Sequence, residues 1–126
     1  MNYLRAKLAL GIMGLVGVMA VYAGDPPIST TVEGVFQKKQ DLTGKQVQIK
    51  GKVVKVNNGV MKRNFLHVQD GTGAKDTNDI TVTSDQTAAV GDQVTITGNV
   101  ATNVDFGAGY SYPVLIEKAM IEVNKP

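Results

Sequence analysis

The chain has 126 residues, about the size of one domain, with a formal net charge of +2, no cysteine and one histidine. These counts exclude a disulfide framework, thiolate chemistry and a metal site built on paired histidines, and no Ser-His-Asp pattern has a recognisable nucleophile context. We therefore expect a protein that is not an enzyme and that uses no cofactor or metal.

The first 23 residues are predicted to be a secretory signal peptide. Arg5 and Lys7 precede an uncharged apolar run of 14 residues, and the small residue Ala23 stands before Gly24. The run is shorter than the roughly 20 residues of a membrane span, although an uncleaved anchor is the alternative. Cleavage after Ala23 would leave a secreted mature chain without stable membrane insertion. Its first residues, 24–29, contain two prolines and are predicted to be extended.

Charge is unevenly distributed in the mature chain. The 13 basic residues lose Arg5 and Lys7 with the signal peptide, which leaves 11 basic against 11 acidic residues. Residues 24–63 hold eight basic and three acidic residues, whereas residues 64–126 hold three and eight. The favoured interpretation is that folding brings the halves together as surface ion pairs. The alternative is a basic patch on one side of the domain.

A short helix is predicted near the mature N-terminus. Thr30, three residues before Glu33, has the spacing of a capping box, so the helix is expected over about residues 31–40. Val32 and Phe36 fall on one helical face, and we expect them to plug one end of the sheet.

The first predicted strand is Gln46 to Val56. Val47 and Ile49 set its inward phase, Gly51 interrupts it, and the valines that follow continue with the phase shifted by one, which indicates a bulge or bend at the glycine. The sequence Asn57-Asn58-Gly59 then predicts a tight hairpin turn.

The second strand lies in the stretch RNFLHVQDGTG, residues 63–73. Leu66 and Val68 alternate with Phe65, His67 and Gln69, so the strand should bury the first pair and present the other three on the opposite face. The glycine-rich segment from residue 70 to residue 73 is predicted to be a turn.

Three further strands are predicted, at residues 80–84, from residue 93 onward and over residues 112–123, with residues 84–89 as either a short helix or a loop. The fourth strand repeats the pattern Gln-Val-x-Ile-x-Gly-x-Val of the first. Gly51 and Gly98 are therefore expected to bend two strands that serve two sides of a closed sheet. The predicted core positions are Val47, Ile49, Leu66, Val68, Ile80, Val82, Val94 and Ile96.

This order of elements predicts an all-β fold, a five-stranded OB-fold Greek-key barrel with a short N-terminal helix over residues 30–126. The segment FLHVQDGTG resembles the second-strand signature of OB-fold domains of the tRNA-anticodon-binding type, and VGDQVTITGNV resembles their fourth strand. With the signal peptide, residues 42–123 resemble small periplasmic single-OB-domain proteins of Gram-negative bacteria. This resemblance implies a periplasmic location and nucleic-acid binding. A second resemblance, to secreted bacterial OB-fold proteins linked with stress and envelope ligands, leaves the ligand class open.

OB-fold domains bind ligands on the face of their second and third strands, between the one-two and four-five loops. In this chain that region combines cations on one lip with aromatic residues on the other, which suits a planar or anionic ligand. The candidate ligand-binding residues are Lys62, Arg63, Phe65, His67, Phe106, Tyr110 and Tyr112. The alternative is that Phe65, Phe106 and Tyr112 belong to the core or plug the barrel ends.

Two smaller groups are not expected to bind a metal ion. Asp70, Asp76, Asn78 and Asp79 offer oxygens of the kind that calcium uses, but their spacing does not match an EF-hand, so a solvated loop is favoured. His67, without a second histidine, is expected to be a surface or stacking residue and not a metal ligand.

The sequence therefore predicts a periplasmic OB-fold binding module for an oligonucleotide, such as a single-stranded nucleic acid, or for another anionic or planar ligand. The alternative is a protein-interaction adaptor associated with a periplasmic redox or envelope system. Lys62 and Arg63 are the two cations expected to contact phosphates.

Overall fold

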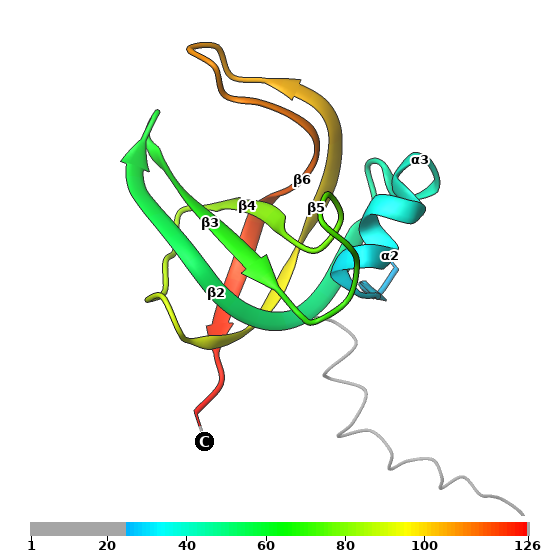
Figure 1. Ribbon diagram of the computed structural model, residues 1–126, viewed down its shortest axis with the longest axis horizontal. Helices are drawn as coiled ribbons and strands as arrows, with labels where there is room; N and C mark the ends of the chain where they lie inside the picture. Colours follow the sequence, from blue (N-terminus) through cyan, green and yellow to red (C-terminus); the bar gives the residue numbers. More distant parts are fainter. Residues whose placement is uncertain (1–24, 126) are drawn as a thin grey trace, which may run out of the picture.

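The computed structural model describes residues 25–125. The predicted signal peptide and its cleavage site lie outside the described residues and remain predictions. No helix within residues 25–125 is long and apolar enough to cross a membrane. The elements, in chain order, are β1 (Ile28–Ser29), α2 (Val32–Gln37), α3 (Lys39–Leu42), β2 (Gln46–Val60), β3 (Arg63–Gln69), β4 (Ile80–Ser84), β5 (Gln93–Asp105) and β6 (Ser111–Val123) (Figure 1).

The long strands form one sheet that curls round until it meets itself. β2 pairs with β5 over its first half and with β3 over its second, both antiparallel, and β3–β4 and β5–β6 are also antiparallel. The circuit is completed by one parallel pair between β4 and β6, Val82 with Ile116. The fold is thus all-β and OB-like, as predicted, but its closure is irregular.

The number of strands differs from the prediction. Ile28 and Ser29 form a sixth strand, which pairs in parallel with Val47 and Gln48 of β2. The two preceding prolines favour extended backbone, so the sequence indicated the conformation of this segment but not its partner.

The core lies inside the curled sheet. All eight predicted core positions are at most 1% exposed. Val32 and Val35 of α2 join the same cluster, and Phe36 packs against it, so the helix closes one end of the sheet as predicted.

Gly98 and Gly51 lie where the sheet bends. At Gly98 the β5–β6 register shifts, and an added Cβ would lie 2.6 Å from the Cγ2 atom of Ile116. At Gly51 strand β2 changes partner from β5 to β3, and an added Cβ would lie 2.6 Å from the carbonyl oxygen of Gln69. Close approach of the neighbouring strand therefore requires glycine at both positions.

The sequence predicts that the inward phase of β2 shifts at Gly51, but the shift occurs later in the strand. Val53 remains buried in the inward phase, and the register with β3 shifts between Val53 and Lys55. Val54 is therefore the bulged residue, and the side chains after it change faces. The consequence is that Lys55 stands opposite His67 of β3.

The predicted helix is shorter and its cap is one residue later than expected. Thr31, and not Thr30, is the N-cap, and its hydroxyl accepts a hydrogen bond from the Gly34 N–H at 3.0 Å. Thr30 lies too early to be the cap, because Thr31 is still extended, with φ −117° and ψ 168°, and the helix begins at Val32. The Thr30 N–H continues the β1–β2 pairing by donating to the carbonyl of Gln48. The helix ends at Gln37, and the short α3 follows separately.

The first hairpin turn also differs from the prediction. β2 runs through the Asn-Asn-Gly segment to Val60, and the register shift between Asn57 and Val60 absorbs that segment. The turn consists of Met61 and Lys62, whose φ angles of 51° and 64° are the left-handed pair of a type I′ hairpin. Residues 85–89, left open between helix and loop, form a loop.

Candidate ligand-binding face

The outward side of β2, β3 and β4 forms one continuous surface, which we call the outer face. Residues directly opposite on neighbouring strands have their Cβ atoms within about 5.5 Å, so the register defines which side chains are neighbours. Three rows cross the sheet: Asn57 with Phe65 and Thr83, Lys55 with His67 and Thr81, and Lys52 with Gln69.

An aromatic cluster covers one end of the outer face. The ring of Phe65 lies 5.5, 5.7 and 6.2 Å from the ring centroids of Phe106, Tyr110 and Tyr112. These partners come from the β5–β6 loop and the start of β6, and the β5–β6 hairpin bends toward the β2–β3 hairpin in Figure 1. The guanidinium carbon of Arg63 lies 4.9 Å from the ring centroid of Phe106, within cation–π range. Five of the seven predicted site residues therefore meet in one place.

Phe65 itself is not available to a ligand, contrary to the prediction that it presents its ring on the open face. It is 1% exposed, because the β5–β6 loop folds over it. Phe65 is thus buried outside the main core cluster, against the three other aromatic rings. For Phe65, the alternative of a structural plug holds. Phe106, Tyr110 and Tyr112 are half-buried, and burial together with the nearby Tyr110 raises the pKa of Tyr112.

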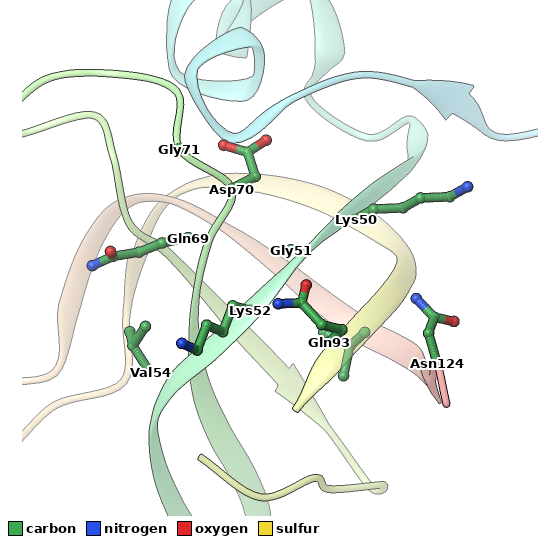
Figure 2. Close-up of a pocket in the computed structure, with 10 residues that line it drawn as sticks. Lys50, Gly51, Lys52, Val54, Gln69, Asp70, Gly71, Gln93 and Asn124 are labelled. Atoms are coloured by element: carbon green, nitrogen blue, oxygen red, sulfur yellow. The ribbon is translucent and has the colours of Figure 1, made fainter. Parts of the chain in front are cut away.

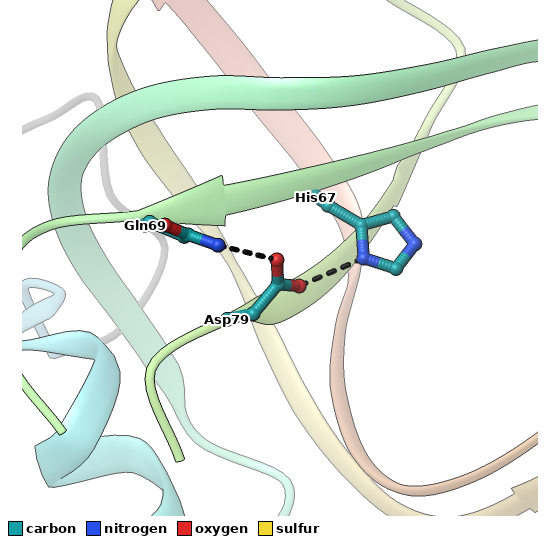
Figure 3. A network of polar contacts seen from close by, with 3 residues as sticks. All are labelled: His67, Gln69 and Asp79. Atoms are coloured by element: carbon teal, nitrogen blue, oxygen red, sulfur yellow. Dashed lines mark hydrogen bonds and ion pairs between the residues drawn. The ribbon is translucent and has the colours of Figure 1, made fainter. Parts of the chain in front are cut away.

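His67 lies on the outer face beside the aromatic cluster but is held by a different partner (Figure 3). Its Nδ1 atom is 2.7 Å from Oδ1 of Asp79, and the Nε2 amide of Gln69 donates to Oδ2 of Asp79 at 3.0 Å. Because an ionised carboxylate only accepts, Nδ1 carries the hydrogen of this contact. The network therefore fixes the ring, and Nε2 is the nitrogen left for a ligand.

The favoured interpretation, in which the basic residues form surface ion pairs with the acidic half of the chain, is wrong for the described residues. Within residues 25–125 the His67–Asp79 contact is the one ion pair, and no lysine or arginine nitrogen comes within 4.0 Å of a carboxylate oxygen. Lys52 and Lys55 are exposed on the outer face, and Lys62 is exposed in the turn beside Arg63. The sequence-based site missed Lys52 and Lys55. The adjacent Val53 and Val54 were the signal for the bulge that places Lys55 there.

The outer face continues into a pocket of about 390 Å³ at the bend of β2 (Figure 2). Lys50 and Lys52 flank Gly51 there, and the amide side chains of Gln93 and Asn124 line the same pocket. The carboxylate of Asp70 turns away from these lysines toward α2.

The turn after β3 caps the helix α2. The Val32 N–H donates to Oδ2 of Asp70 at 2.9 Å, and the Glu33 N–H donates to the hydroxyl of Thr72 at 3.0 Å. Partial burial would raise the pKa of Asp70, but hydrogen bonds from the Thr72 hydroxyl and from the backbone of Val32 and Thr72 outweigh it, so this pKa is lowered.

The acidic loop does not gather its oxygens around one point. The carboxylate of Asp70 is used at the helix and that of Asp79 at His67, in two separate networks. Residues 25–125 contain no group of three or more acidic or histidine side chains placed to hold a metal ion.

Comparisons with known proteins bear on the fold. No protein-family model and no curated protein matches the chain. Two OBody structures, both bound to hen egg-white lysozyme, are similar to it, with 16% and 17% sequence identity and TM-scores of 0.57 and 0.56. The matches cover 79% and 80% of this chain and 96% of each OBody. A chain assigned as an aspartyl-tRNA synthetase of Leishmania major Friedlin matches 90% of this chain and 26% of its own length, at 15% identity and a TM-score of 0.54. At these identities the likeness concerns the fold alone.

Proposed function

We propose that the protein is a binding module for single-stranded nucleic acid and that the strand lies along the outer face. The observation that carries this proposal is the set of unpaired cations beside an aromatic cluster, on the face and loops that OB domains use for oligonucleotides. The pair of His67 and Asp79 lies on this face, but within residues 25–125 no nucleophile of recognisable context stands with it, so we propose binding and not catalysis.

The cations would contact phosphates, and the aromatic cluster would stack bases. Lys52 and Lys55 line one side of the face, and Lys62 and Arg63 stand at its end. The half-exposed rings of Phe106 and Tyr110 offer stacking surfaces, and the guanidinium over Phe106 extends that platform. Since the mature chain carries equal numbers of basic and acidic residues, attraction would be local, with little long-range steering.

The location proposed for this activity is the periplasm. It rests on the predicted signal peptide and on the family resemblance, since residues 1–24 are outside the described structure. Intact-mass analysis of protein from the native host should begin at Gly24. Mature protein that retains Met1 to Ala23 would contradict secretion with cleavage.

A protein-interaction adaptor is the second candidate. Met120 of β6 is 67% exposed and Met61 of the β2–β3 turn is 36% exposed. Exposed methionines suit adaptable protein contacts. The OBody structures, which are bound to lysozyme, show a similar fold holding a protein. A pull-down from periplasmic extract with and without nuclease separates the candidates: partners lost after nuclease support the nucleic-acid role, and protein partners retained support the adaptor.

The direct test is fluorescence-anisotropy titration of labelled single-stranded oligonucleotides with the mature chain. We expect saturable binding at low salt that weakens in a Tyr110→Ala variant, while Lys45→Gln, which removes an exposed lysine away from the outer face, serves as the matched control. Absence of saturable binding at low salt would overturn the proposal and place the adaptor first.

A further inference from the structure

A second pocket, of about 560 Å³, adjoins the aromatic cluster at Arg63. It lies between the β2–β3 turn, the end of β4 and the middle of β6. Three of its lining side chains are cations from two separate elements, Lys62 and Arg63 from the hairpin and Lys118 from β6, against one carboxylate, Asp85. We call this site the cationic pocket.

The walls of the cationic pocket are tied to one another. Asn64 joins the hairpin to the loop after β4, because its Oδ1 accepts from the Gly59 N–H at 3.0 Å and its Nδ2 donates to the Gln86 carbonyl at 3.0 Å. Ser84 joins that loop to β6 by donating to the carbonyl of Ala119. These hydrogen bonds therefore fix the hairpin, the loop after β4 and β6, which together line the pocket, relative to one another.

The same walls present donors. The side-chain oxygen of Gln86 accepts from the Ile121 N–H at 2.7 Å, which leaves the amide hydrogens of Gln86 as donors. Thr83 also lines the pocket and is 2% exposed, and its hydroxyl makes no hydrogen bond to another described residue. Lys118 adopts a left-handed backbone, φ 53°, within the irregular stretch of β6 opposite Gly98. This conformation is strained for a residue other than glycine, and such strained residues cluster at functional sites.

The charge of the cationic pocket selects the ligand class. Within residues 25–125 none of its three cations forms an ion pair, and with one carboxylate they leave two positive charges. A phosphodiester carries one negative charge, whereas a phosphomonoester carries about 1.5 to 2 at pH 7. The volume is within the range of about 300–1,000 Å³ that small-molecule sites occupy, which is ample for a nucleotide. We propose that the cationic pocket binds a terminal nucleotide through its phosphomonoester group.

This inference rests on the proposed function, because it assigns the end of the bound strand to the cationic pocket and the rest of the strand to the outer face. The shared chemistry is a phosphomonoester, which a strand end or a free nucleotide can supply. The test therefore compares one labelled oligoadenylate with a phosphate at its 5′ end, at its 3′ end or at neither, and adds adenosine 5′-monophosphate as a separate probe.

We expect one of the two phosphorylated strands to bind about tenfold more tightly than the strand without a terminal phosphate, as for one added hydrogen bond to a charged group. In a Lys118→Asn variant this ratio should fall close to one. Asparagine tolerates the left-handed backbone, so the fold should persist. The matched control, Lys45→Asn, makes the same charge change on an exposed residue outside the pocket and should keep the ratio.

The outcomes separate the two proposals. Equal binding of all three strands overturns the proposal for the cationic pocket but not the proposal for the outer face. The same holds if the preference for a terminal phosphate is lost equally in Lys118→Asn and Lys45→Asn. Binding of the nucleotide alone, with loss in Lys118→Asn, supports the cationic pocket and contradicts the strand-binding function. Absence of binding by every probe overturns both.

Discussion

Both ends of β3 carry polar side chains, but these side chains make different contacts. After the C-terminal end, side-chain oxygens of Asp70 and Thr72 accept hydrogen bonds from the N–H groups at the start of α2. At the N-terminal end, Arg63 stacks on Phe106, and its charge is not neutralised within the described chain. Polar residues at one end of a strand can therefore be structural, and function is to be sought where polar groups stay unpaired.

The largest expected effect concerns Phe65, which lies between these ends and is buried in the aromatic cluster. Phe65→Ala should lower the free energy of unfolding by about 3–5 kcal/mol, because it empties a site buried under three rings. Urea denaturation followed by circular dichroism measures this change. A loss below about 1 kcal/mol would mean that Phe65 lies on an open face after all.

Removal of the helix cap should have a smaller effect on stability. Asp70→Ala should cost about 1–2 kcal/mol at pH 7, since it removes the acceptor of the Val32 N–H. Asp76→Ala, in the same loop but exposed, is the matched control and should cost little.

The cap should also make stability depend on pH. Because folding lowers the pKa of Asp70, its stabilisation is present above the unfolded-state value of about 3.9 and is lost as the pH falls through the lower folded-state value. Unfolding curves measured from pH 6 down to pH 2 should therefore converge for the wild type and Asp70→Ala. A gap that stays constant to pH 2 would show that the charge of Asp70 is not involved.

Replacement of Tyr110, unlike replacement of Asp70, should affect ligand binding more than stability. Tyr110→Ala should weaken oligonucleotide binding by about 1–3 kcal/mol per stacked base. It should change stability less than Phe65→Ala, since Tyr110 is only half-buried. Parallel anisotropy and urea measurements separate the two effects. A variant that binds as tightly as the wild type would remove the aromatic cluster from the site.

Apolar alternation was enough to predict the inside of the fold. It identified Leu66 and Ile96 as core positions, and the matched glycines indicated both bends. These features are local, because the side-chain period and the glycine requirement are written along single strands.

What the sequence could not supply depends on pairing between distant segments. Phe65 becomes buried only because a loop some 40 residues later folds over it. Thr31, and not Thr30, is the cap because the extended segment that pairs with β2 continues to Thr30 and the helix begins only at Val32. Lys55 reaches the outer face because the bulge at Val54 is decided by the register with β3.

The salt dependence of oligonucleotide binding tests the central claim most directly. Four phosphate contacts, from Lys52, Lys55, Lys62 and Arg63, should give a log–log slope of about −2.8 for a single strand, at about −0.7 for each contact. Lys55→Gln should reduce the slope to about −2.1, and Lys45→Gln should leave it unchanged. A slope near zero, or one that responds equally to both variants, would contradict the assignment of the outer face as the binding surface.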